Sequence, residues 1–193
     1  MTMHFFSILL IVAAIIVLGL IALYNKLVNQ IEIVRNNQKQ IDIQLDRRFK
    51  VFESLINVVK KYMDYEQTTL KDVVALRNQA QIAQQSGDEK SRMAAEDSIS
   101  KIAGNLNVVF EQYPNLKADQ NALQLQEEIV STENKLAYAK QAFNDSIERY
   151  NVAKKVFPAN IVVTMFSSLN CAFVYWGLSD EKIAEQENYT VKL

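Results

Sequence analysis

The side chains best suited to chemistry in this chain of 193 residues are carboxylates. Asp42 and Asp46 are four residues apart, and Arg47 and Arg48 follow directly. On a helix, positions four apart share one face, so two carboxylates there could act as an acid–base pair. The interpretation that we favour is a solvated face on which each carboxylate forms an ion pair. The same two interpretations apply to a second acidic group, Glu127, Glu128 and Glu133.

Other catalytic chemistry lacks the necessary residues. The chain has one His, His4, and one Cys, Cys171, which excludes di-metal sites with His ligands, zinc sites built on Cys and His, and nucleophile–His arrangements in the soluble part. Four Gly cannot build a phosphate-cradling loop. A net charge of −1 without a basic run argues against nucleic acid. We therefore predict no cofactor, no metal and no enzymatic activity.

Arg48 differs from the other charged residues because it lies on an apolar stripe. An unpaired charge is costly there, so we expect its side chain to extend to water or to pair with a carboxylate. Asp145 and Glu148 are the partners that the sequence suggests.

These residues must be positioned by helices, because Gly and Pro are too scarce for many turns. Apolar residues recur at spacings of three and four and predict helices over 24–63, 66–85, 89–112 and about 120–157. Asp88 and Asp119 are suited to cap the third and fourth helices, and Pro114 and Pro158 to end them. The connections are short, which makes successive helices antiparallel. We predict an all-α fold, an antiparallel up-down-up-down four-helix bundle with long first and last helices and coiled-coil-like seams.

The N-terminal segment 5–23 is a predicted transmembrane helix. It has no charged residue and would span roughly 28 Å, close to the thickness of the bilayer core. Phe5, Leu10, Ile15, Leu20 and Leu23 mark its course. A cleaved signal peptide is the alternative, but residues 1–4 contain no Lys or Arg and no small-residue cleavage site follows.

The charges that flank this segment predict its orientation. Lys26, Arg35 and Lys39 follow it, which places the bulk of the chain in the cytoplasm and residues 1–4 outside. Between residues 18 and 48 there is no Pro and only Gly19, so we expect one helix to continue from Phe5 to about Tyr62.

The C-terminal part, 158–193, begins uncharged and becomes acidic. We predict that it packs at the membrane-proximal base of the bundle domain, 24–157. An interfacial helix and a second transmembrane pass over 159–178 are the alternatives. The candidates for contact with the membrane interface are Phe166, Phe173, Tyr175 and Trp176.

A series of sequence blocks resembles the bacterial LemA family: "IDIQLDRR" at 41–48, "YPNLKA" at 113–118, "LQLQEE" at 123–128, "YN" at 150–151 and "FPAN" at 157–160. The residues of these blocks that we single out are Asp42, Arg47, Arg48, Tyr113, Pro114, Tyr150, Asn151, Phe157 and Pro158. Asn37-Gln38 and Glu53 depart from the family pattern, which usually has Ala-Trp and Pro there. The resemblance covers nearly all of residues 24–160, with the apolar segment before them as in the family, and the sequence beyond Asn160 matches only loosely.

The resemblance implies a bacterial inner-membrane protein with one N-terminal span and a cytoplasmic four-helix bundle. It implies no catalytic residues, and a link of one relative to magnetosome membranes suggests membrane organisation by analogy alone.

Together these observations favour a non-enzymatic, membrane-anchored scaffold that self-assembles as a homo-oligomer and organises or shapes the membrane. Apolar residues off the main stripe of the first helix could face a neighbouring protomer: Ile33, Ile43, Val51, Ile56 and Val58. The alternative is a tethered sensor or adaptor that binds an unidentified protein partner or a small ligand within the bundle. A cavity lined by Asn105, Asn107 and Gln112 would favour that alternative.

Overall fold

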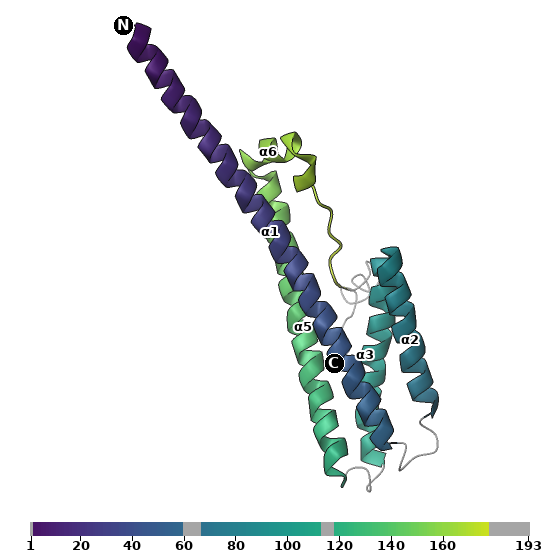
Figure 1. Ribbon diagram of the computed structural model, residues 1–193. Helices are drawn as coiled ribbons and strands as arrows, with labels where there is room; N and C mark the ends of the chain where they lie inside the picture. The colour runs from purple at the N-terminus through teal and green to yellow at the C-terminus, as the bar shows by residue number, and fades with distance from the viewer. Residues whose placement is uncertain (1, 60–66, 113–117, 178–193) are drawn as a thin grey trace, which may run out of the picture. The chain divides into compact units, whose positions relative to one another are not determined.

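The computed structural model describes residues 2–59, 67–112 and 118–177, and over these ranges it contains five α-helices and no strand. The helices are α1 (Thr2–Val59), α2 (Gln67–Ser86), α3 (Glu89–Gln112), α5 (Gln120–Lys155) and α6 (Ala159–Met165), and a short 3₁₀ turn, η2 (Ser167–Leu169), follows α6 (Figure 1). The prediction of an all-helical chain is confirmed, and the four long helices begin and end close to the expected residues.

Helix α1 contains both the apolar N-terminal segment and the amphipathic segment that follows it. It has no Pro to interrupt its hydrogen bonds, and its one Gly, Gly19, is tolerated within a helix of this length. The expected continuity of the helix is therefore confirmed up to Val59, and residues 60–62 lie outside the described part of the chain. Among the described helices, α1 alone is long and apolar enough to cross a membrane.

The turn between α2 and α3 is built from local hydrogen bonds. Gly87 has a φ of 75°, and the amides of Gly87 and Asp88 donate to the carbonyls of Gln84 and Ala83, which ends α2 in a Schellman motif. The Asp88 carboxylate then accepts from the Ser91 amide at 3.1 Å. At the start of α5, Asp119 accepts from the Asn121 amide at 2.8 Å and the Ala122 amide at 3.2 Å. Both predicted capping residues are confirmed.

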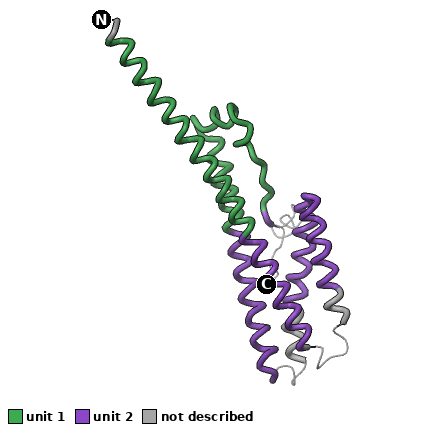
Figure 2. The backbone as a smooth tube through the Cα atoms, in the orientation of Figure 1, with its two compact units in different colours: residues 1–39, 142–175 green, residues 40–141, 176–193 purple. Residues whose placement is uncertain are grey.

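The chain divides into two compact units, and each contains part of α1 and part of α5 (Figure 2). Unit 1 consists of residues 1–39 and 142–175, and unit 2 of residues 40–141 and 176–193.

In unit 1, buried side chains come from three segments of the chain. Helix α1 contributes Leu27, Ile31 and Val34, and α5 contributes Phe143, Ile147 and Tyr150. The segment after α5 contributes Ala159, Val162 and Leu169. The segment after α5 therefore packs on its own unit. Helix α6 has seven residues and is about 10 Å long, far too short to cross a bilayer, so the alternative of a second transmembrane pass is wrong.

Unit 2 has an apolar core to which α1, α3 and α5 contribute: Phe52, Leu55, Ile99, Ala103, Ala122 and Ile129. Helices α2 and α3 pack along each other (Figure 1). The prediction that Val51, Ile56 and Val58 face another protomer is wrong, because Ile56 is buried and the two valines pack against this core. Ile33 and Ile43 remain exposed.

Candidate functional site

The most unusual feature of unit 2 is a cluster of buried charges centred on Arg48. The Arg48 side chain is 1% exposed and pairs with Glu96 on α3, whose side chain is also buried. Its second nitrogen donates to Ser100 at 2.7 Å and lies 3.3 Å from a Glu133 oxygen. Ser100 in turn donates to Glu133 at 3.1 Å, so the three helices α1, α3 and α5 share one hydrogen-bonded group.

Of the two outcomes expected for Arg48, extension to water or pairing with a carboxylate, the structure shows the pairing, but the two partners suggested by the sequence are wrong. Asp145 and Glu148 are exposed on α5. The actual partners, Glu96 and Glu133, lie on two different helices, and the Ser100 hydroxyl and the Glu96 backbone carbonyl accept further hydrogen bonds from the same guanidinium.

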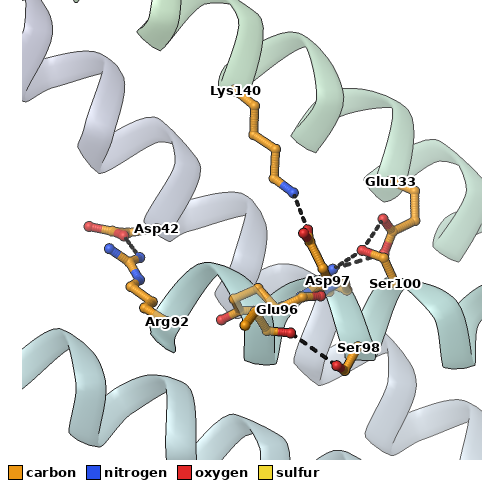
Figure 3. A network of polar contacts seen from close by, with 10 residues as sticks. Asp42, Arg92, Glu96, Asp97, Ser98, Ser100, Glu133 and Lys140 are labelled. Carbon is orange, nitrogen blue, oxygen red and sulfur yellow. Dashed lines mark hydrogen bonds and ion pairs between the residues drawn. The ribbon is translucent and has the colours of Figure 1, made fainter. Parts of the chain in front are cut away.

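A second arginine extends the cluster. Arg92 is buried, pairs with Asp42 and lies 3.5 Å from a Glu89 oxygen. Figure 3 shows Asp42 beside Arg92 and Lys140 pointing toward Asp97. The Lys140–Asp97 separation is 3.6 Å.

Trp176 covers two of these cations. Its ring is 5% exposed, with the Arg92 guanidinium 5.2 Å and the Lys140 ammonium 5.1 Å from its centre. Both distances suit cation–π attraction. Burial lowers the pKa of Lys140, and the nearby Asp97 carboxylate partly opposes that shift. Burial therefore disfavours the charged form of Lys140, and the Asp97 carboxylate and the Trp176 ring stabilise that form.

The two carboxylates of the candidate acid–base pair on α1 each have their own cationic partners. Asp42 pairs with Arg92, whereas Asp46 binds Lys50 at 2.8 Å and Arg77 at 2.9 Å. The hydrogen bonds from Lys50 and Arg77 lower the pKa of Asp46. A carboxylate with a lowered pKa is a poor proton donor or acceptor near neutral pH, so the ion-pair interpretation is the one that the structure supports.

The second acidic group behaves in the same way. Glu128 pairs with Arg47, and Glu133 belongs to the Arg48 cluster. No group of three or more His, Cys, Asp and Glu side chains is placed to hold a metal ion within the described ranges. The side chains of Asn105, Asn107 and Gln112 lie outside the described part of the chain.

In unit 1 the segment after α6 is fastened to α5 through Tyr150. The buried Tyr150 hydroxyl donates to the Leu169 carbonyl and accepts from the Cys171 amide at 2.9 Å. Lys154 donates to the Cys171 carbonyl at 3.1 Å, and Asn151 donates to the Tyr175 hydroxyl at 3.1 Å. Burial raises the pKa of Tyr150 above its ordinary value of 10.0.

We expect Tyr150→Phe to lower the free energy of unfolding by about 1–3 kcal/mol, because it leaves a buried carbonyl and an amide without their partner. Since the folded pKa is raised, the stabilisation is complete below pH 10.0 and is lost as pH rises through the folded value. Denaturant titrations of both chains at neutral and at strongly alkaline pH measure this. A difference between the chains that stays constant up to alkaline pH would contradict the assignment; lysine titration is common to both chains and cancels.

The remaining predicted residues are placed as follows. Phe5, Leu10 and Ile15 are exposed on α1, and Leu20 and Leu23 are partly buried in unit 1. Tyr113 and Pro114 lie outside the described residues. Phe157 is exposed and Pro158 precedes α6, so Phe157 does not belong to the buried stripe of α5. Of the four interface candidates, Phe166 and Tyr175 are exposed, Phe173 packs edge-on against Tyr150, and Trp176 is the buried residue of the charge cluster.

These features define a class: all-helical proteins with one long, partly apolar N-terminal helix and buried ion pairs that join its second half to other helices. Within that class, this chain belongs to the LemA family, whose sequence profile matches residues 37–189. It is 26% identical over 148 residues to Protein LemA of Metamycoplasma hominis, a match that covers 77% of this chain and 67% of that protein. The resemblance found in the sequence is confirmed, and the match extends into the C-terminal part.

Proposed function

We propose that this protein is a membrane-anchored helical scaffold without enzymatic activity, which self-assembles and organises the bacterial inner membrane. The single observation that carries the proposal is α1. The first part of this helix exposes an uninterrupted apolar surface, and the second part contributes the buried residues Ile41, Leu45 and Phe52 to unit 2. A helix that continues from a bilayer into a folded domain without a flexible linker restricts the orientation of that domain relative to the membrane.

The arrangement that we propose for the long helices is an antiparallel four-helix bundle. Pairs between α1 and α5 support it, because the residue numbers rise on one helix as they fall on the other: Asn37 donates to the Ala142 carbonyl at 3.1 Å, and Arg47 to Glu128 at 2.9 Å. Short connections between successive helices agree with this topology. We place the bundle in the cytoplasm, with residues 1–4 outside, on the charges that follow the span.

The surface that we propose for self-assembly is a stripe on α5. Leu123, Val130 and Tyr138 are exposed at spacings of seven and eight residues, as in a coiled-coil seam. Glu127 and Lys135 line the same shallow groove as the stripe. Because the patch carries both a negative and a positive charge, two copies can pair in opposite directions, with the glutamate of one against the lysine of the other.

Val130→Glu tests this surface. A charge at the centre of an apolar contact should cost about 2 kcal/mol of association free energy, which raises the dissociation constant roughly thirtyfold. The measurement is the mass of the extracted protein as a function of concentration. Ile82→Glu is the matched control, because Ile82 is an exposed apolar residue of α2 in the same unit. Equal masses for the two variants at every concentration would rule out the α5 stripe.

A further inference from the structure

The outer side of α6 and the turn before it are unusually apolar for a surface. Phe157, Ile161, Met165 and Phe166 are all exposed, with Phe157 at 75% and Met165 at 63%. Residues 156–179 contain no charged side chain. The opposite side of α6 is occupied, because Ala159 and Val162 are buried in unit 1. Contiguous exposed apolar residues of this kind mark a contact surface.

The polar residues of α6 make their hydrogen bonds locally. The Thr164 hydroxyl donates to carbonyls of its own helix, at 2.8 Å to Ile161 and 3.0 Å to Asn160. The Asn160 side chain accepts from the Ile161 amide at 2.9 Å. Because these groups already have partners, moving the helix out of water costs less than its composition suggests.

The position of this surface within unit 1 indicates what covers it. The Phe166 ring meets the Tyr24 ring edge-on, with centroids 5.1 Å apart, directly after the apolar run of α1. Beside this contact is a cavity of about 310 Å³. Its lining has only apolar and aromatic side chains: Val17, Leu20, Ile21 and Tyr24 from α1, and Val162, Met165 and Phe166 from the α6 segment.

The α1 residues that line this cavity form the last two turns of the apolar run of α1, within about 10 Å of the end of that run. If α1 spans the bilayer, these turns lie in the leaflet where the span ends. The lining of the cavity joins the apolar side chains of α1 to those of the α6 segment. Exposed Lys26 and Lys155 flank the two segments in sequence, as expected where an apolar surface meets phosphate headgroups.

We propose that residues 156–166 are seated in the bilayer interface, with the outer side of α6 in contact with lipid acyl chains and one acyl chain in the cavity between α6 and α1. The inference rests on the proposed membrane anchor. It assigns the C-terminal segment a function of its own, a second, non-spanning membrane contact beside the span.

The test is the accessibility of nitroxide spin labels in the full chain, reconstituted into vesicles of phosphatidylcholine and phosphatidylglycerol. Labels are placed one at a time at Ile161, Met165, Ile15 and Ile82 in a Cys171→Ser background, and collisions with oxygen and with a water-soluble nickel complex are measured. Ile15 reports the span and Ile82 reports exposed protein surface in water. We expect the ratio of oxygen to nickel collisions at Ile161 and Met165 to shift from the Ile82 value toward the Ile15 value.

Three outcomes would overturn the inference. Water-like ratios at Ile161 and Met165, with a lipid-like ratio at Ile15, would refute the interfacial contact and leave the anchor intact. Low collision rates with both reagents at Ile161 and Met165 would show that protein, such as a second copy, covers the surface. Nickel accessibility at Ile15 would refute the anchor itself, and the inference with it.

Discussion

Arg48→Ala should lower the free energy of unfolding by about 3–5 kcal/mol, because it removes one member of a buried ion pair and leaves the other charge without compensation. Glu96 is 7% exposed and would lose its arginine partner beside a newly formed cavity. The loss also removes the hydrogen bond to Ser100 and the link to Glu133 on α5. Thermal and urea unfolding of the full chain in detergent, followed by helical circular dichroism, measures the effect.

Arg47→Ala is the matched control for this substitution. Arg47 is the adjacent residue and also pairs with a glutamate, Glu128, but the two side chains are 42% and 37% exposed. An exposed pair contributes about 0–1 kcal/mol. Similar losses for Arg47→Ala and Arg48→Ala would contradict the importance of burial in the cluster.

A double variant separates the charge from the packing. Arg48→Met with Glu96→Leu removes both members and fills their space with apolar side chains, which is often neutral for stability. We expect the double variant to recover most of the loss. A variant that is as unstable as Arg48→Ala would show that Ser100 and Glu133, and not the pair with Glu96, dominate the contribution of Arg48.

Insertion of Gly-Gly-Ser after Tyr24 should leave the helices folded and abolish or strongly reduce assembly. The insertion breaks α1 between the end of its apolar run and Leu27, the first of its buried residues. Each Gly costs about 1 kcal/mol of helix stability, so the helix frays at this point and the anchor becomes a flexible tether. Helical content and the mass of the extracted particle are the two measurements.

The same three residues inserted after Gly87 form the control. Gly87 lies in the turn between α2 and α3, so an insertion there lengthens a turn at the cost of the local hydrogen bond from Asp88 to Ala83 and leaves α1 continuous. Assembly that survives both insertions would mean that the continuity of α1 at Tyr24 is not needed and that its apolar part is a simple tether.

Much of the fold could be predicted from the sequence because its signals are local. Periodic apolar residues and the caps Asp88 and Asp119 specify where helices lie, and the absence of Pro between residues 18 and 48 specifies that α1 is continuous. The need of Arg48 for water or for a carboxylate partner was likewise predictable, since its position on the apolar stripe is a property of one helix.

The partners of Arg48 were not predictable, because they depend on how helices are aligned against one another. Glu96 on α3 gives no local signal that distinguishes it from other glutamates, and the choice of Asp145 and Glu148 assumed a different alignment of α5 with α1. The contacts of Trp176 with Lys140 and of Cys171 with Tyr150 could not be foreseen for a related reason. Trp176 and Cys171 lie in an irregular segment whose path follows no periodic pattern.

The mass of the native protein particle, extracted in mild detergent and corrected for bound detergent, tests the central claim most directly. A self-assembling scaffold predicts one defined mass that is a multiple of 22.1 kDa and persists on dilution. A particle that contains a single chain at every concentration and in every mild detergent would contradict it.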